Sequence, residues 1–98
     1  MAAVIWTAPA LADLDRICEY VAGDSPRQAE LLADRFFRAT GRLEVFPLSG
    51  RIVPELGREA IREIIYEAYR IIYFVDGPVV EILMVHHTSL PLSGIDRH

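Results

Sequence analysis

The sequence predicts an α+β domain of two layers, in which a pair of antiparallel helices packs on an antiparallel β-sheet. Three observations lead to this fold class. Two amphipathic helical stretches follow each other in the first half of the chain, three β-rich stretches follow each other in the second half, and a short β-rich stretch, Val4-Ile5-Trp6, precedes them all. Because 98 residues suffice for one small domain and not for two, we expect a single domain over residues 1–98.

The helix hairpin is expected at about residues 9–46. Thr7 can cap the first helix, in which apolar residues recur at spacings of three and four until Gly23 ends it. Ser25 caps the second helix, and Pro47 is expected to end it. The link between the helices is short, which predicts that they run antiparallel.

The β-meander is expected at about residues 61–87. Its strands are predicted at 61–66, 69–75 and 79–86. Asp76-Gly77 is a turn signal between the last two strands, but Pro78 cannot donate a ladder hydrogen bond, which leaves room for a loop longer than two residues. Residues 48–60 are predicted to be irregular, and residues 88–98 to form a loose tail.

Alternation along the strands predicts which sheet face meets the helices. If both strand loops hold an even number of residues, the helix-facing side is almost entirely apolar and carries Ile64, Tyr66, Tyr69, Ile71, Tyr73, Val80, Ile82 and Met84. The outer face then carries Glu63, Arg70, Ile72, Phe74, Glu81 and Leu83. An odd second loop would instead place Glu81 among the tyrosines, where a carboxylate loses its hydration at a cost in free energy.

The composition points to a protein partner and away from a phosphate-binding surface. Apolar residues make up 52% of the chain and the mean hydropathy is +0.24, which is high for so small a domain. Either the core is rich in Val, Ile and Leu, or a partner covers an apolar face, and we favour the partner. The net charge of −4 argues against a surface that neutralises many phosphates. All ten basic residues are arginines, which suit planar, paired contacts.

The cysteine content and the N-terminus indicate a reducing compartment. Cys18 is the only cysteine, so no internal disulfide can form, and its place in the first helical pattern predicts a small core residue. The N-terminus lacks the basic start of a signal peptide, and no apolar run reaches membrane-spanning length. We therefore expect a cytoplasmic protein without a membrane partner.

Arg70 is the most informative single residue, because a guanidinium in an apolar strand needs an ion-pair partner or access to water. Its partner would be Glu63 or Glu81 on a neighbouring strand. Alternatively, Arg70 and Glu63 could join His86 or His87 in a general acid–base ribonuclease, with the arginine steadying the phosphate. The chemistry alone favours the ion pair.

No metal or cofactor site is predicted. His86 and His87 are neighbours in a strand and point to opposite faces, so they cannot both bind one metal ion. The chain has neither a glycine-rich phosphate loop nor a nucleophile elbow. The extended segment 50–55 contains Pro54 and suits a sheet edge or a peptide-binding margin, where Arg51 is either solvated or bound to the C-terminal end of the second helix.

Short motifs at characteristic intervals resemble those of a known family over about residues 4–87. They are Trp6, Pro9-Ala10, Ala12-Asp13-Leu14, Phe46-Pro47, Gly50-Arg51, Val53-Pro54-Glu55, Arg62-Glu63-Ile64, Tyr69-Arg70-Ile71-Ile72-Tyr73, Val80-Glu81-Ile82 and Val85-His86. In this order the chain resembles the RelE/ParE superfamily of bacterial toxins. These are the toxin halves of type II toxin–antitoxin modules, and they are often called plasmid stabilisation proteins.

The resemblance implies a fold and a partner. The fold is a helix hairpin packed on a curved antiparallel sheet, in agreement with the patterns above. The partner is a cognate antitoxin whose C-terminal segment wraps the toxin, hides apolar surface and forms a heteromeric complex in the cytoplasm. Such a partner would account for the high apolar content.

The superfamily divides by activity, and the residues favour the ParE-like branch. RelE-like members cut mRNA on the ribosome, whereas ParE-like members inhibit DNA gyrase. Arg70 matches a catalytic arginine of the RelE-like nucleases, but Thr88 stands at the place of their second arginine, no tyrosine follows Tyr73, and the chain has no lysine. Glu63 within Arg62-Glu63-Ile64 is the ParE-like pattern. The resemblance therefore implies a gyrase inhibitor that acts by binding.

Two alternatives remain open, namely a ribosome-dependent mRNA endoribonuclease and a degenerate toxin that only binds its antitoxin. The nuclease candidates are Arg70, Glu63, His86 and His87. The residues expected to contact the antitoxin or the target are Arg51, Arg62, Arg70, Glu81 and Thr88.

Overall fold

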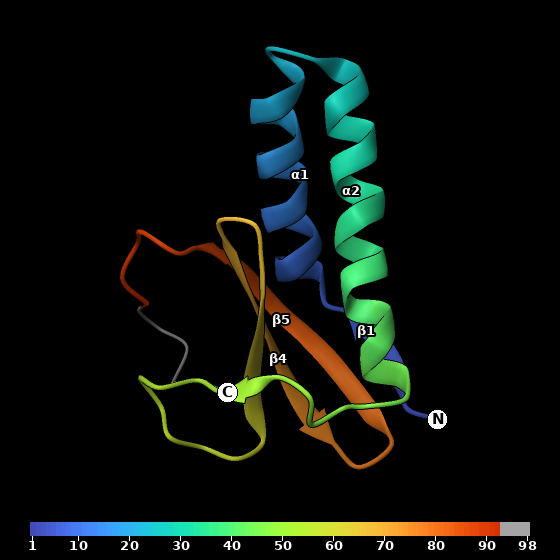
Figure 1. Ribbon diagram of the computed structural model, residues 1–98, viewed down its shortest axis with the longest axis vertical. Helices are drawn as coiled ribbons and strands as arrows, with labels where there is room; N and C mark the ends of the chain where they lie inside the picture. The colour runs from blue at the N-terminus through green and yellow to red at the C-terminus, as the bar shows by residue number, and fades with distance from the viewer. Residues whose placement is uncertain (93–98) are drawn as a thin grey trace.

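The computed structural model describes residues 1–92 and places them in a helix layer and a sheet layer, the α+β arrangement that the sequence predicts. Figure 1 shows the two helices side by side, with the tip of their hairpin reaching well beyond the sheet. The elements are β1 (Ala3–Trp6), α1 (Ala8–Ala22), α2 (Pro26–Gly41), a 3₁₀ turn (Arg42–Glu44), β2 (Arg51–Ile52), β3 (Ile61–Tyr66), β4 (Tyr69–Asp76) and β5 (Val79–His87). Within residues 1–92, neither helix is long and apolar enough to cross a membrane.

Both helices begin at the predicted caps. The Thr7 hydroxyl accepts a hydrogen bond from the backbone N–H of Ala10 at 3.3 Å. The Ser25 hydroxyl accepts one from the N–H of Gln28 at 3.2 Å. Each cap satisfies a backbone donor that the first helical turn leaves unpaired. α1 ends at the predicted place, with Gly23 as its C-cap residue.

The predicted end of the second helix at Pro47 is wrong. α2 ends at Gly41, and the chain tightens into the 3₁₀ turn Arg42–Glu44. Glycine weakens an α-helix because its backbone loses the most entropy there. The tighter turn also brings Leu43 into the core, where it is fully buried. The proline therefore lies beyond the end of the helix and does not set it.

The sheet has the strand order β1-β5-β4-β3-β2. β3, β4 and β5 form the predicted antiparallel meander. β1, whose pairing the sequence left open, runs parallel to β5 and makes the sheet mixed. β2 pairs with β3 at the opposite edge, which confirms the edge predicted for segment 50–55.

The loop between β4 and β5 holds two residues, Gly77 and Pro78, so the longer loop that Pro78 allowed does not form. Gly77 supplies the positive φ of 57° that such a turn needs. The carbonyl of Pro78 accepts a hydrogen bond from Ala3 N–H at 2.8 Å, and this bond helps to attach β1.

A bulge in β5 changes the predicted facing near the end of the sheet. Tyr73 lies opposite Ile82, whereas Ile72 lies opposite Met84, so Leu83 is an extra residue without a partner. The bulge reverses the alternation beyond it. Met84, predicted to face the helices, packs on the outer face instead, and Val85 joins the helix-facing core. The other residues predicted for the helix-facing side do pack there.

The sheet carries an apolar cluster on each face. The larger one, under the helices, includes the fully buried Phe36, Leu43, Ile71, Tyr73 and Ile82. The smaller one, on the outer face, consists of Val53, Ile61 and Ile72, with Leu56 and Leu92 packed against it. Loop 53–57 and the chain near Leu92 therefore cover part of the outer face, and the described part of the predicted loose tail, residues 88–92, packs back onto the sheet. Residues 93–98 of that prediction lie outside the described residues.

We expect Gly50→Ala to destabilise the protein by about 1–3 kcal/mol, as overpacking of a filled core does. A Cβ at Gly50 would lie 2.5 Å from the Glu63 carbonyl oxygen and 2.6 Å from the Tyr73 hydroxyl, which accepts the Gly50 N–H at 2.9 Å. Gly41→Ala is the matched control, because its Cβ would meet no atom within 4 Å and alanine favours the helix. Urea denaturation measures both, and equal stability of the two variants would contradict the close packing at Gly50.

Candidate functional site

Arg70 lies in β4 on the outer face and makes three hydrogen bonds to carboxylates. Its Nε donates to Oε1 of Glu63 at 2.5 Å. Its Nη1 and Nη2 donate to the two oxygens of Glu55, each at 2.7 Å. Only 9% of the Arg70 side chain is exposed. The predicted ion pair with Glu63 is confirmed, and all three nitrogens of the guanidinium have a carboxylate partner.

Glu63, in β3, is the centre of this arrangement. Its side chain is completely buried, and its second oxygen, Oε2, accepts a hydrogen bond from Nε of Arg51 at 2.5 Å. Arg51 comes from β2, directly opposite Glu63 in the strand pairing. A buried carboxylate is tolerated only when cations and hydrogen bonds replace its hydration, and here the two adjacent strands supply one arginine each. Arg51 is thus neither simply solvated nor bound to the end of α2.

Glu55 completes the network from the loop after β2. Its two hydrogen bonds from Arg70 form a bidentate pair, the strongest geometry for an arginine and a carboxylate. The hydrogen bond from Arg70 lowers the pKa of Glu55 to about 2. The same contact, together with Glu63, raises the pKa of Arg70 above its ordinary value. The four residues Arg51, Glu63, Arg70 and Glu55, called the ion network below, carry no net charge.

Sequence reasoning missed Glu55 and expected Glu81 as the other possible partner. Glu81 lies on β5 opposite Phe74, four positions along β4 from Arg70, and no ion pair joins it to another residue within the described chain. Glu55 reaches Arg70 because loop 53–57 folds over the outer face, where Val53 and Leu56 pack. Glu55 belongs to the Val53-Pro54-Glu55 motif, but no local signal marks such a return of the chain.

The two histidines point to opposite faces, as strand alternation predicts. His86 lies opposite Arg70 on the outer face, and its Nε2 donates to the carbonyls of Leu90 at 3.2 Å and Pro91 at 3.0 Å. His87 lies opposite Tyr69 on the helix-facing side, where the two rings meet edge to face. No group of three or more His, Cys, Asp or Glu side chains suited to a metal ion occurs within residues 1–92.

The remaining predicted contact residues hold backbone segments in place. Arg62 donates from Nε to the carbonyl of Glu59 at 2.9 Å and from Nη1 to that of Gly50 at 3.1 Å. Thr88 is exposed, and its N–H bonds to the carbonyl of Ala68 at 2.8 Å across the strand ends. Neither side chain joins the ion network.

Asp13 is a second residue whose role the sequence did not reveal. Its Oδ2 accepts the backbone N–H of Val85 at 3.0 Å, and its Oδ1 pairs with Arg16. This bond ties α1 to β5 just after the bulge at Leu83, where the ladder is irregular. Asp13 belongs to the Ala12-Asp13-Leu14 motif of the family resemblance, but nothing in the sequence indicated that its carboxylate bonds to β5.

Comparisons with known proteins agree with this fold and these motifs. Residues 4–90 match the family model described as ParE toxin of type II toxin-antitoxin system, parDE. The chain is 35% identical over 89 residues to Toxin RelE2 of Caulobacter vibrioides, covering 91% of this chain and 98% of that protein. It therefore belongs to the ParE toxin family, within the ParE/RelE superfamily of toxins from type II toxin–antitoxin systems.

Two solved structures share the fold. The structure of the chromosomal ParDE system from P. aeruginosa superimposes with a TM-score of 0.75 at 24% identity, covering 89% of this chain and 96% of that one. The structure of the toxin–antitoxin complex RelBE2 from Mycobacterium tuberculosis superimposes with a TM-score of 0.58 at 26% identity, covering 88% and 96%.

We expect Arg70→Met to lower the free energy of unfolding by about 3–5 kcal/mol, because it leaves Glu63 buried with one cation fewer. Arg51→Met is the matched control. Both arginines donate from Nε to Glu63 at 2.5 Å, but the Arg51 side chain is 59% exposed and that of Arg70 only 9%. Arg51→Met also takes a cation from Glu63, but the exposed position of Arg51 lets water replace it, so we expect a smaller loss. Denaturant titration of the two variants checks the difference, and equal losses would show that burial does not decide the strength of this network.

Stability should also fall in acid, and Glu55 should account for part of the loss. Its pKa in the folded protein, about 2, lies below the ordinary value of 4.5, so its contribution is complete above about pH 5 and disappears as the pH falls toward about 2. Because 43% of the Glu55 side chain is exposed, solvent screening limits this contribution to about 1 kcal/mol. The stability difference between the wild type and Glu55→Gln should therefore be constant near neutral pH and shrink in acid. A difference that grows in acid would reverse the expected sign.

Proposed function

We propose that this chain is a ParE-like toxin that inhibits DNA gyrase by binding to it, breaks no bond itself, and is neutralised by a cognate antitoxin. The observation that supports this proposal is that all hydrogen-bonding nitrogens of Arg70 are already occupied by carboxylates. This residue matches a catalytic arginine of the RelE-like nucleases, and here its Nε, Nη1 and Nη2 all donate to carboxylates.

An arginine that stabilises a phosphate in a transition state must present its N–H groups to that phosphate. For Arg70 to do so, the phosphate would have to displace the bidentate Glu55. It would also approach two carboxylates, Glu55 and Glu63, that repel it. The ion network has no net charge and the whole chain carries −4, so the network adds no positive charge that would draw an RNA backbone to this face.

Exposed apolar side chains support an antitoxin partner. Large hydrophobic side chains that are 40% exposed or more include Ile5, Leu11, Phe37, Val45, Phe46, Leu48, Ile65 and Leu90. Of these, Val45, Phe46 and Leu48 belong to one short segment and line one open pocket, and adjacent exposed apolar side chains of this kind mark a surface that another chain covers. Both structural neighbours come from systems described with two partners, ParDE and RelBE2. The antitoxin would stabilise the toxin by binding only its folded form.

The alternative, a ribosome-dependent ribonuclease, draws on one observation. Arg70 and His86 lie opposite each other on adjacent strands, so a cation and a potential proton carrier share one face. The relative in Caulobacter vibrioides is called Toxin RelE2. In this chain, however, His86 uses its Nε2 proton to hold the carbonyls of Leu90 and Pro91. In this chain both Arg70 and His86 are thus occupied by structural contacts, which favours the binding function over the nuclease.

We expect the purified chain to inhibit supercoiling by gyrase, and the antitoxin to restore it, with no new cut ends in translated mRNA. His86→Ala should arrest growth as the wild type does, because in a binding inhibitor this side chain only orders residues 90–91. Supercoiling assays, primer extension and growth curves measure the three effects. New mRNA ends with unaltered supercoiling, abolished by His86→Ala in a folded protein, would establish the nuclease instead. No growth arrest from a folded wild-type chain would indicate a toxin that only binds its antitoxin.

A further inference from the structure

A pocket of about 480 Å³ lies where α1 passes the ends of β4 and β5, and its volume is within the range of small-molecule sites. The residues that line it come from the middle of α1, the start of β4 and the chain from the end of β5 onward. They include Arg16, Ile17, Tyr20, Tyr69, His87 and Ser89. None of them belongs to the ion network, so this pocket is separate from the site around Arg70.

His87 has a ring N–H without an acceptor. Its Nδ1 accepts the backbone N–H of Ser89 at 3.1 Å and lies 2.7 Å from the Ser89 hydroxyl oxygen. A ring nitrogen that accepts a hydrogen bond carries no proton, so the proton of the neutral imidazole is on Nε2. Within residues 1–92, Nε2 has no hydrogen-bond partner. The edge-to-face contact with Tyr69 holds the ring in place.

Arg16 adds a positive charge with donors to spare. Its Nη2 donates to Oδ1 of Asp13, whose other oxygen accepts the N–H of Val85. A guanidinium has five N–H groups, and within residues 1–92 Nε and Nη1 of Arg16 have no acceptor. Asp13 lines a smaller hollow that shares Arg16 and His87 with the pocket, but both of its oxygens are bonded. No acidic side chain of the described chain lines the pocket itself.

Two tyrosines give the pocket flat apolar surface. Tyr20 is 83% exposed, and Tyr69 is half-buried and packs edge to face on Phe36. Exposed aromatic rings are surfaces on which planar ligands stack. The pocket thus combines aromatic surface with N–H donors and one uncrowded cation, and it has no carboxylate of its own to repel an anion.

We propose that this pocket binds a nucleoside monophosphate, with the phosphate on Arg16 and Nε2 of His87 and the base on Tyr20. Phosphate oxygens are strong acceptors that match the paired donors of a guanidinium. An inorganic anion would use only the donors, and an apolar ligand only the tyrosines. His87 lies on the helix-facing side of the sheet and Arg70 on the outer face, so this binding is independent of the proposed function and breaks no bond.

The first test compares three probes on the purified chain: adenosine monophosphate, adenosine and inorganic phosphate. We expect adenosine monophosphate to shift the NMR signals of the His87 ring and to bind about tenfold or more tightly than either part alone, because each part lacks half of the contacts. Equal affinity for the nucleotide and for phosphate would indicate an adventitious anion only, and would overturn the proposal. Binding without a shift at His87, or no binding up to about 10 mM, would also overturn it.

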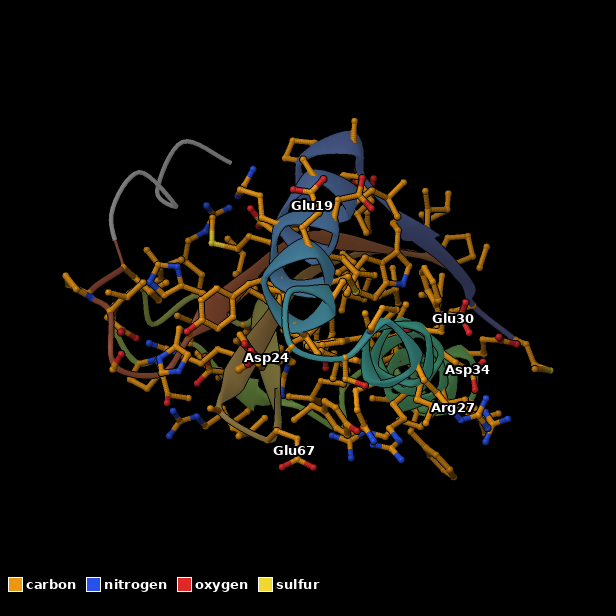
Figure 2. The ribbon with its side chains drawn as sticks, turned by 90° about the horizontal axis from the view of Figure 1, so that it is seen from above. Glu19, Asp24, Arg27, Glu30, Asp34 and Glu67 are labelled. Carbon is orange, nitrogen blue, oxygen red and sulfur yellow. The ribbon has the colours of Figure 1, made fainter. Side chains whose placement is uncertain are left out.

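The second test addresses the cation. Arg16→Gln should weaken binding of adenosine monophosphate about tenfold and leave adenosine unaffected, because it removes a charge-assisted contact to the phosphate. The Arg16 side chain is 68% exposed, so the variant should fold. Arg27→Gln is the matched control, since Arg27 is exposed, lies outside the pocket lining and stands out from α2 on the side away from α1 (Figure 2). Equal losses in the two variants would show a general charge effect and overturn the proposal.

The third test addresses the ring. Tyr20→Phe keeps the aromatic surface and should bind adenosine monophosphate as the wild type does, whereas Tyr20→Ala should bind it about fivefold or more weakly. Affinity for inorganic phosphate should be the same in both variants. Equal nucleotide affinity of Tyr20→Ala and Tyr20→Phe would contradict stacking on this residue. Because these tests measure binding to the chain alone, their failure leaves the toxin function standing, and failure of the supercoiling assay leaves the pocket standing.

Discussion

The completely buried carboxylate of Glu63 is the constraint on which the outer face of this toxin depends. A carboxylate without water must have cations close by, and the pairing of β3 with its two neighbours decides where they come from. Arg51 on β2 and Arg70 on β4 each use Nε for Glu63. The remaining two nitrogens of Arg70 then require acceptors of their own, and Glu55 supplies both oxygens. Loop 53–57 is thereby held over the sheet, and it covers the apolar cluster around Val53 and Ile72.

These contacts explain why an arginine at the position of Arg70 need not imply nuclease chemistry. An arginine at a fixed place in a strand can face a substrate or close a buried network, and its neighbours decide between the two. Here one acidic neighbour, Glu63, comes from the adjacent strand and another, Glu55, from a loop that a nuclease would need to keep away. The compensation of two cations by two anions leaves the ion network without net charge, so the network itself adds no positive charge that would attract a phosphate chain.

The sequence predicted what depends on neighbouring residues and missed what depends on distant ones. Helix caps at Thr7 and Ser25, the bounds of the three meander strands to within one residue, and the alternation of His86 and His87 are local, and they were predicted correctly, whereas the short strand β2 was not. The bulge at Leu83 was not predicted, because the mismatch between two strands leaves no mark in either. Glu55 was missed for a related reason. Its contact with Arg70 depends on the path of a loop, and a glutamate beside a proline has the same appearance whether the loop folds in or out.

The sheet and the helix hairpin differ in whether their carboxylates are paired with arginines of the same chain. On the sheet, the carboxylates of the ion network are buried, and each finds an arginine within the chain. On the helix hairpin, Asp15, Glu19 and Glu30 border apolar surface without a cation in the described part of the chain. Exposed carboxylates without an ion pair add little to the stability of the free chain, whereas the buried pairs of the sheet are needed to hold its outer face together. The sheet therefore compensates its own buried charges, whereas the hairpin, whose tip also extends beyond the sheet, leaves these three carboxylates without an ion pair in the described residues.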